Sequence, residues 1–345
     1  MRSHGLSRRE PRRPWSGLEL GLALGPVLGG CYSTELDPDL TGVFACRTAQ
    51  ESAEQPACPS GQTCVNGRCE DSNALPTLSI INPEESKVFL VDLSVGNAME
   101  VDPIPVNLTV QGSNLELVGS PSSSDHVFGQ GQVAIYMDGE EVATVTEGSL
   151  SAPAPLPLLI PPIPGPHRIA VRARRNDGLD YDNDSALSTR LVWVENANNE
   201  GVLPMVAIRW PWPGTIISTD DEQVEVRITT LNFQLVDADN TDNTRREAEI
   251  GHAHVYYDQE FPRCAMDDLC DDSYLGVAGT PPAGELSRSD LVLPASDEQI
   301  ASLTAVLRHY NHSIYRHPFG CEDPGSEAES CQLIFEEIEI IRVVD

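Results

Sequence analysis

Histidines in the C-terminal part of the chain carry the clearest candidate chemistry. His252 and His254 lie two residues apart, so on a β-strand their side chains would point to one face, about 6.6 Å apart. His312 follows a later apolar run, together with His309 and His317. Imidazoles brought together from two strands are good ligands for Zn or Cu. We therefore predict a Zn or Cu site formed by His252, His254 and His312.

The same residues have a simpler interpretation. Ala253, Val255 and Tyr257 form the apolar face of this strand, so we expect the histidine face to be the accessible one. A His-x-His pair is common, and there His252 and His254 would hydrogen-bond across strands or remain solvated. Both interpretations stay open on the sequence alone.

Acidic residues form a second group with possible binding chemistry. Asp180, Asp182 and Asp184 occupy alternate positions shortly after Gly178. Clustered carboxylate oxygens on a loop suit Ca²⁺, although here the glycine precedes the aspartates and no Glu closes the loop as in an EF-hand. Calcium binding at the three aspartates is one expectation, and a solvated acidic loop is the other.

Motifs of common enzymes are missing from the sequence. It contains no G-x-S-x-G, no Walker loop and no H-E-x-x-H. We therefore expect a non-catalytic protein. Trp210 and Trp212 would stack on sugars if exposed, which makes a carbohydrate-binding accessory domain an alternative; if buried, they would fill a domain junction.

The nine cysteines fall into a pattern typical of disulfides. Eight follow Cys31 in three local groups, and even numbers of clustered cysteines in an exported chain favour disulfides over metal binding. A zinc site is the alternative for the first group, although its gaps exceed the usual Cys-x(2–4)-Cys spacing. That group allows three connectivities, of which we favour the alternating one. The expected disulfides are Cys46–Cys64, Cys58–Cys69, Cys264–Cys270 and Cys321–Cys331.

The charge and the N-terminus bear on partners and location. With 22 Lys and Arg against 53 Asp and Glu, the 345 residues carry a net charge of −31, which disfavours nucleic acid as a partner. Arginines before position 14 precede a short apolar stretch, about Leu18 to Gly30, which is typical of an export signal and too short for a membrane span. One interpretation of this segment is an ordinary cleaved signal, with Cys31 paired to another cysteine.

Leu28-Gly-Gly-Cys31 resembles the lipobox of bacterial lipoproteins. The resemblance implies cleavage before Cys31 and a lipid on that cysteine, which would anchor the protein to a membrane. Because no Asp follows the cysteine, it also implies the outer membrane, on its periplasmic or external face.

The remainder of the chain is a duplication. In our alignment His252, His254 and His312 correspond to Gln132, Ala134 and Asp177, so only the second copy carries the histidines. Four blocks recur in the same order: Pro76–Pro83 with Pro204–Pro211, Val106–Val118 with Val224–Val236, Gly131–Asp138 with Gly251–Asp258, and Ala170–Asn176 with Ala305–Asn311.

Each block predicts a strand, because apolar and polar residues alternate, as at Val106, Leu108 and Val110. Many short strands between Gly, Pro and Asn turns predict an all-β fold. The runs Asn232–Leu235, Val255–Asp258 and Gly165–Ala173 resemble immunoglobulin-like domains of bacterial surface proteins. The resemblance implies two tandem immunoglobulin-like β-sandwiches, and a binding, adhesion or spacer role with a protein or glycan partner. The expected division is a signal at 1–30, a disulfide-rich module at 31–74, and sandwiches at 75–197 and 200–345.

Overall fold

The structure is a computed structural model that describes residues 58–93, 101–119, 127–152, 155–199, 201–218, 223–237, 246–258, 274–281, 286–293, 300–321 and 331–343. All of them belong to the unit Val43–Asp345. The predicted lipid-bearing Cys31, and Cys46, Cys264 and Cys270 of the predicted disulfides, lie outside the described residues. Within the described part, no helix has the length and apolar character of a membrane span.

A small hairpin precedes the sandwiches. It consists of β1 (Gln62–Val65) and β2 (Arg68–Asp71), joined by Asn66 and Gly67, which both adopt positive φ as a tight two-residue hairpin requires. A disulfide joins Cys58 to Cys69, as predicted. Cys64 is also disulfide-bonded. With only two short strands, the hairpin is stabilised by such cross-links together with the burial of Val65 in the core of the first sandwich.

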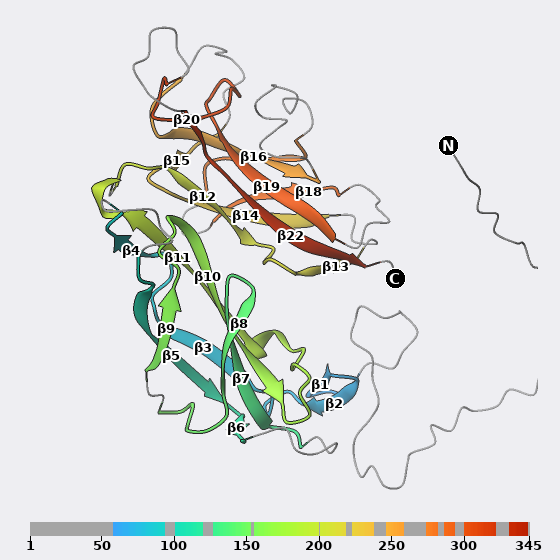
Figure 1. The fold of residues 1–345 in the computed structure, drawn as a ribbon. Coiled ribbons are helices and arrows are strands. Elements are labelled where there is room, and N and C mark those ends of the chain that lie inside the picture. The colour runs from blue at the N-terminus through green and yellow to red at the C-terminus, as the bar shows by residue number, and fades with distance from the viewer. Residues whose placement is uncertain are drawn as a thin grey trace, which may run out of the picture. The chain divides into compact units, whose positions relative to one another are not determined.

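In the described residues the first sandwich has nine strands, which form two sheets; Figure 1 shows their arrangement. One sheet has the order β3-β5-β9. The other has the order β4-β11-β10-β7-β6, and β8 also pairs with β7. The strands are β3 (Thr77–Asn82), β4 (Lys87–Val91), β5 (Ile104–Ser113), β6 (Glu116–Leu117), β7 (Gln130–Met137), β8 (Glu140–Val145), β9 (Leu156–Ile160), β10 (Gly165–Arg175) and β11 (Leu187–Asn196).

The second sandwich repeats this pairing. One sheet has the order β12-β14-β18. The other has the order β13-β22-β19-β16-β15, and β17 also pairs with β16. The strands are β12 (Met205–Trp210), β13 (Ile216–Ser218), β14 (Val224–Leu231), β15 (Gln234–Leu235), β16 (Ile250–Tyr257), β17 (Gly276–Ala278), β18 (Ser287–Leu291), β19 (Ile300–Arg308) and β22 (Phe335–Val343). β20 (Arg316–His317) and β21 (Gln332–Leu333) form a separate two-stranded sheet, near which a second predicted disulfide, Cys321–Cys331, is present.

The strand pairing is that of an immunoglobulin-like sandwich, which confirms the predicted all-β fold. In each copy a strand near the start, β4 or β13, pairs in parallel with the last long strand, β11 or β22, while all other long strands pair antiparallel. The helical segments among the described residues are two short 3₁₀ turns, η2 (Asp184–Ala186) and η3 (Ala197–Asn199).

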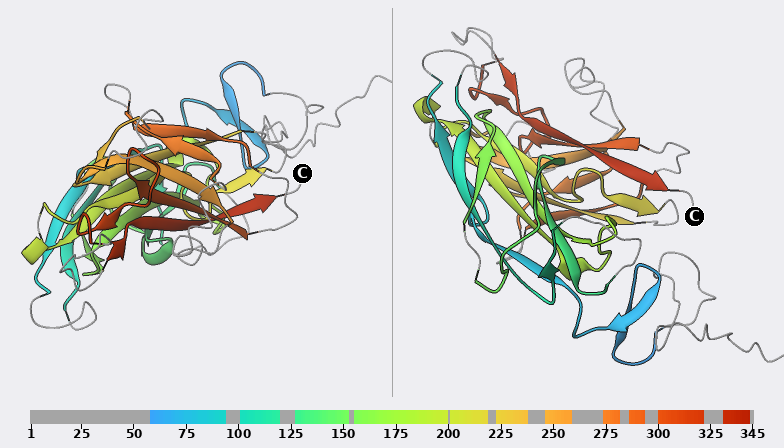
Figure 2. Two further views of the ribbon diagram at one scale, coloured as in Figure 1. Left: turned by 90° about the horizontal axis from the view of Figure 1, so that it is seen from above. Right: turned by 60° about the horizontal axis from the view of Figure 1, so that its bottom comes forward.

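Alternating apolar residues build a core between the sheets of each sandwich. Val106, Leu108 and Val110 of β5 are all buried, whereas Asn107 between them is exposed. Each such side chain contributes roughly 1.5–3 kcal/mol when it leaves water. In the second copy β16 pairs with β19 and β19 with β22, and these strands supply one wall of the equivalent core. Figure 2 shows the ribbon from two further directions.

The strand register corrects one block of the sequence alignment by one residue. Val171 pairs with Ile135 in the first copy, and Ala305 pairs with Val255, the counterpart of Ile135, in the second. Val171, rather than Ala170, therefore corresponds to Ala305. The other three blocks keep the predicted correspondence, as the pairing of Ile80 with Val110 and of Ile208 with Ile228 shows.

Candidate metal centre

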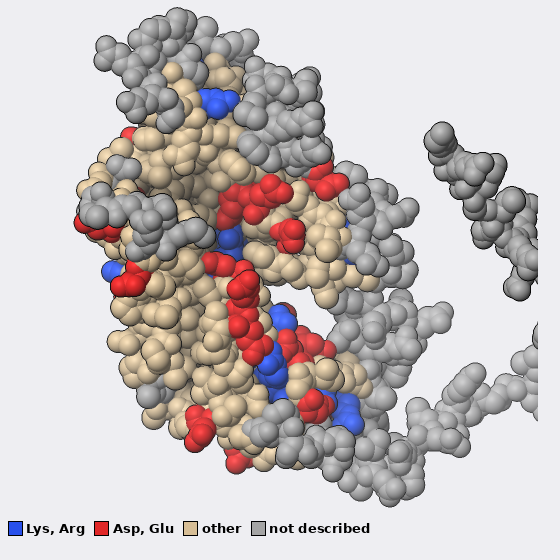
Figure 3. Space-filling model, in the orientation of Figure 1, with Lys and Arg blue, Asp and Glu red and all other residues tan. Residues whose placement is uncertain are grey.

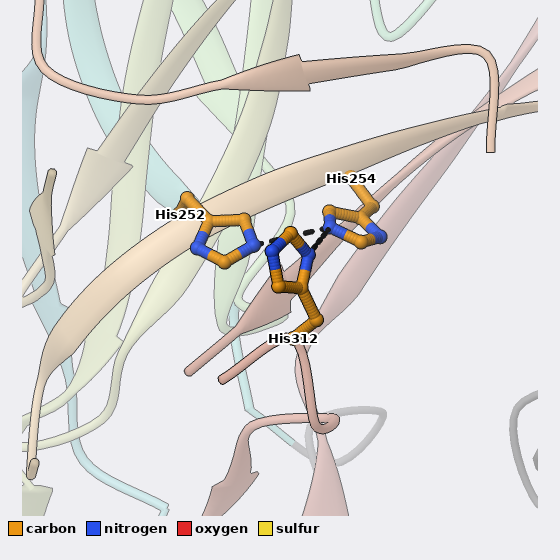
Figure 4. Close-up of side chains that lie close together, drawn as sticks. All are labelled: His252, His254 and His312. Carbon is orange, nitrogen blue, oxygen red and sulfur yellow. Dashed lines mark hydrogen bonds between the residues drawn. The ribbon is translucent and has the colours of Figure 1, made fainter. Parts of the chain in front are cut away.

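Three histidines of the second sandwich converge on one point (Figure 4). The Nε2 atom of His254 lies 3.1 Å from Nε2 of His252 and 3.0 Å from Nδ1 of His312. One ligand atom from each of the three lies within 4.8 Å of the others. These are the three residues that the sequence predicted as metal ligands, and the fold brings all of them together.

Two elements supply the ligands. β16 carries His252 and His254 on one face because side chains alternate along a strand. His312 comes from the tight turn after β19, in which the His309 amide donates to the Ser313 carbonyl at 2.9 Å and the His312 amide to the His309 carbonyl at 3.0 Å. β16 and β19 are neighbours in the sheet, so this turn lies beside the end of β16 where His252 pairs with Arg308.

The backbone of His312 is left-handed, with φ 64°. The corrected register makes Gly178 its counterpart, and not Asp177 as the sequence alignment indicated. The amide of Gly178 donates to the Arg175 carbonyl at 3.0 Å, as that of His312 does to His309, and Gly178 has φ 92°. The second copy thus places a histidine where the first has a glycine, although left-handed backbone costs a residue with a side chain roughly 1–2 kcal/mol.

The histidine face is buried, so the expectation that it would be accessible was wrong. His252 is 0% exposed and His254 is 1% exposed, whereas His312 is partly exposed. The ring of Tyr274 lies 4.0 Å from that of His254, and a small apolar cluster covers this side of the sheet. The cluster contains Tyr256, Val306 and Ile314, with Tyr274 and Leu333 packed against it. Tyr256 belongs to β16 and shares the histidine face, whereas Tyr274, Ile314 and Leu333 come from other segments, so the sequence pattern of β16 alone could not show their contribution.

The buried histidines are held in the neutral form. Burial, followed by the charges of His312 and Arg308, lowers the pKa of His252 to about 3. Burial, followed by the charges of His252 and Arg308, lowers the pKa of His254 to about 2. A neutral imidazole keeps one ring nitrogen with a free lone pair, and a metal ligand must be in this form. At neutral pH these rings can therefore offer their nitrogens to a metal ion.

The described residues of the group offer only imidazole nitrogens as ligand atoms. Nitrogen donors favour Zn, Cu, Ni and related transition metals, whereas Ca²⁺ and Mg²⁺ require oxygen ligands. Three imidazoles also match the number of protein ligands in many zinc sites that keep one position for water or another donor. The donor set therefore fits Zn or Cu.

The three aspartates predicted to bind calcium are not brought together in this way. Asp180 forms ion pairs with Arg172 at 3.2 Å and Arg174 at 3.3 Å. The carboxylate of Asp182 accepts a hydrogen bond from the backbone amide of Asn66, and Asp184 begins η2. Among the described residues, the group of three side chains close enough to share an ion is the histidine group.

The remaining histidines and tryptophans singled out in the sequence are not part of this group of three, although His309 lies in the same turn as His312. His309 is buried and its ring packs against Tyr315 and Phe319. Trp210 is 41% exposed, and Trp212 is half-buried beneath the guanidinium of Arg209, 5.3 Å from its ring centre. Acidic side chains form a band with interspersed basic ones on the face drawn in Figure 3, in keeping with the charge of −31.

Sequence reasoning missed two residues next to the site, Arg308 and Tyr256. Arg308 donates through Nη1 to the carbonyl oxygen of His312 at 2.9 Å and through Nη2 to the hydroxyl of Tyr256. That hydroxyl lies 3.5 Å from Nδ1 of His254. The corrected register aligns this pair with Arg174 and Tyr136, which form the same hydrogen bond, whereas the sequence alignment set Arg308 opposite Ala173.

The sequence matches no protein-family model and no curated protein. Solved structures similar to the chain include fibronectin(III)-like modules of Clostridium thermocellum CbhA, at 12% identity and a TM-score of 0.22, covering 78% of this chain and 95% of that one. The Ig1-2 module of the Drosophila receptor protein tyrosine phosphatase DLAR matches at 10% identity and a TM-score of 0.19, covering 79% and 99%.

A third similar structure is SGBP-B of the Bacteroides ovatus mixed-linkage glucan utilization locus, in complex with a mixed-linkage heptasaccharide. It matches at 9% identity and a TM-score of 0.17, covering 77% of this chain and 70% of that one. These values are too low for an argument about function. The fold therefore rests on the strand pairing of this chain, and its function on the chain's own residues.

Proposed function

We propose that the protein is a non-catalytic binding protein whose second sandwich holds one Zn or Cu ion through His252, His254 and His312. The observation that carries this proposal is the position of two other imidazole nitrogens beside Nε2 of His254, one of His252 at 3.1 Å and one of His312 at 3.0 Å. Nε2 of His254 lies within hydrogen-bonding distance of a ring nitrogen of each of the other two histidines, and a metal ion bound among the three nitrogens would replace these two contacts with three coordinate bonds.

The duplication supports a specific role for the second copy. The first sandwich has the same strands and the same Arg–Tyr pair, but Gln132, Ala134 and Gly178 stand where the second has histidines. An immunoglobulin-like sandwich of this type therefore folds without the histidines. A buried histidine cluster that stability does not require points to a ligand.

The place of action that we propose is the cell envelope, with a lipid on Cys31 holding the protein to the outer membrane. The disulfides Cys58–Cys69 and Cys321–Cys331 support an oxidising compartment, where such bonds persist. In this setting the sandwiches would act as spacers that present the metal site and their loops to a protein or glycan partner. Loss of membrane association in a Cys31→Ala variant, measured by fractionation, tests the anchor.

Metal content tests the binding role. The exported protein, purified without chelators, is expected to carry about one Zn or Cu ion per chain, or to take one up on titration with Zn²⁺ or Cu²⁺. The His252→Ala/His254→Ala double variant should lose this ion, because it removes two of three ligands. His317→Ala is the matched control, since this half-buried histidine lies outside the cluster. A double variant that binds metal as the unmodified protein does would refute the proposal.

A further inference from the structure

Arg308 is the residue that ties the histidine cluster to its surroundings. Its side chain is completely buried, and its two terminal nitrogens reach in different directions. Nη1 donates to the main-chain carbonyl of His312, and Nη2 donates to the hydroxyl of Tyr256, which lies next to the ring of His254. One planar guanidinium thus contacts both the turn that carries one ligand and the side chain next to another. A lysine could not do this, because its ammonium is a single point of donation.

The contact with the His312 carbonyl bears directly on ligand position. His312 sits in left-handed backbone, which only a well-held turn maintains for a residue with a side chain. The hydrogen bond from Arg308, 2.9 Å long, holds the carbonyl group of His312 and so helps to keep the left-handed turn that carries the ring. Loss of this turn would move the Cα atom of His312, and with it Nδ1, away from His254.

The contact with Tyr256 acts on the second ligand. The Tyr256 hydroxyl lies 3.5 Å from Nδ1 of His254, on the opposite side of the ring from Nε2, which faces the other histidines. A hydrogen on Nδ1 directed at this oxygen leaves Nε2 with the lone pair. Ligating histidines generally donate their other ring N–H to such an outer partner, which sets both tautomer and orientation.

The first sandwich shows what the same arginine does where there is no histidine cluster. Arg174, the counterpart of Arg308, also donates to its tyrosine, Tyr136, at 2.9 Å. Nη2 and Nη1 also donate to the carboxylate of Glu141, Nε donates to that of Asp180, and the side chain is 19% exposed. The Arg–Tyr pair is common to both copies, whereas the bond to the turn carbonyl is described only for Arg308. The copy in which the arginine donates to the turn carbonyl is therefore also the copy that carries the three histidines.

From these contacts we infer that Arg308 is a positioning residue for the metal site: without touching the ion, it holds His312 through its carbonyl and His254 through Tyr256. This inference rests on the proposed function, since it concerns the affinity of the same site. Loss of such an outer partner typically weakens metal binding by about 10–100-fold.

The test uses the full exported protein and titration with Cu²⁺ and Zn²⁺. The Arg308→Lys variant keeps the charge but loses the double contact, so its Kd is expected to rise by about 10–100-fold. The electron paramagnetic resonance spectrum of bound Cu²⁺ should also change, because two ligands shift. Arg174→Lys is the matched control: it disturbs the equivalent Arg–Tyr pair in the other sandwich and should change neither the Kd nor the spectrum.

A second variant covers the case in which Arg308→Lys does not fold. Tyr256→Phe removes only the hydroxyl beside His254, and it should weaken binding and alter the copper spectrum in the same direction; Tyr136→Phe is its control. Folded Arg308→Lys protein with unchanged Kd and spectrum would overturn the positioning role. Where Arg308→Lys cannot be prepared, a Tyr256→Phe variant with unchanged Kd and copper spectrum would overturn the positioning role. If the unmodified protein binds neither ion, the proposed function itself fails, and the inference falls with it.

Discussion

His312 in the second sandwich occupies the turn position that Gly178 occupies in the first. Both residues have positive φ, 64° and 92°, and both donate their amide to the carbonyl three residues earlier. The fold tolerates glycine at this position without strain, so the histidine serves something other than the turn. Its ring contacts His254 through Nδ1 at 3.0 Å, which is the contact that completes the cluster.

A His312→Gly variant tests whether the metal affinity can be lost without a loss of folding stability. The variant retains the backbone carbonyl that Arg308 contacts and relieves the left-handed strain, so its free energy of unfolding without metal should stay within about 1 kcal/mol of the original. Metal affinity should fall by more than the roughly 10–100-fold loss expected for an outer partner, because a ligand is missing. Urea denaturation and metal titration measure the two quantities. Unchanged affinity would remove His312 from the ligand set.

The reverse exchange should create a site in the first sandwich. A variant with Gln132→His, Ala134→His and Gly178→His places three imidazoles on the equivalent positions beside the existing Arg174–Tyr136 pair. We expect the metal content to rise by one ion per chain. The new site should be weaker than the native one, since Arg174 contacts Glu141 and Asp180. A folded variant, as judged by circular dichroism, that gains no ion would show that these three positions do not suffice.

Gly251 is required by a close backbone approach. A Cβ atom there would lie 1.9 Å from the carbonyl oxygen of Arg308, and one on Gly131 would meet Arg174 at the same distance. Gly251→Ala and Gly131→Ala should each lower the free energy of unfolding by about 2 kcal/mol or more, because the strands must separate. Only Gly251→Ala should also weaken metal binding, since it displaces the strand that carries His252. Equal metal affinity in the two variants would contradict this.

The first sandwich should show a pH-dependent stability that comes from His167. Burial lowers its pKa, but the hydrogen bond and the charge of Asp138, together with the hydrogen bond to the Ile163 carbonyl, outweigh this and raise the pKa above its usual value. A raised pKa in the folded state means that protonated His167 stabilises the fold below about pH 6.5, and that this contribution is lost as the pH rises through the folded-state pKa.

Denaturation of His167→Asn against the unmodified protein, at pH 5.5 and pH 9, measures this effect. The substitution should lower the free energy of unfolding by about 1 kcal/mol more at pH 5.5 than at pH 9. The expected difference is kept this small because Asp138 is partly exposed to solvent. His317→Asn is the control, since the pKa of His317 is lowered by burial and its pH dependence should have the opposite sign. A cost for His167→Asn that does not change with pH would show that the pair with Asp138 is not charged.

The sequence determined the fold class and most of the strand correspondence. Val106, Leu108 and Val110, like Val224, Val226 and Ile228, alternate with polar residues, and all six are buried as predicted. Alternation is a local property, since neighbouring side chains on any strand point to opposite faces. The His252–His254 pair follows from the same property. Local cysteine spacing also predicted the Cys58–Cys69 and Cys321–Cys331 disulfides.

Only the tertiary structure decided how the site is closed. The sequence placed His252 and His254 on an accessible face, but Tyr274 packs on His254, and Ile314 and Leu333 pack against Tyr256 and Val306 of the same face. It also misplaced the counterpart of His312 by one residue, because an alignment by residue type does not record which strand positions pair. Burial and register depend on contacts between segments distant in the chain, and a periodic pattern within one segment carries no information about them.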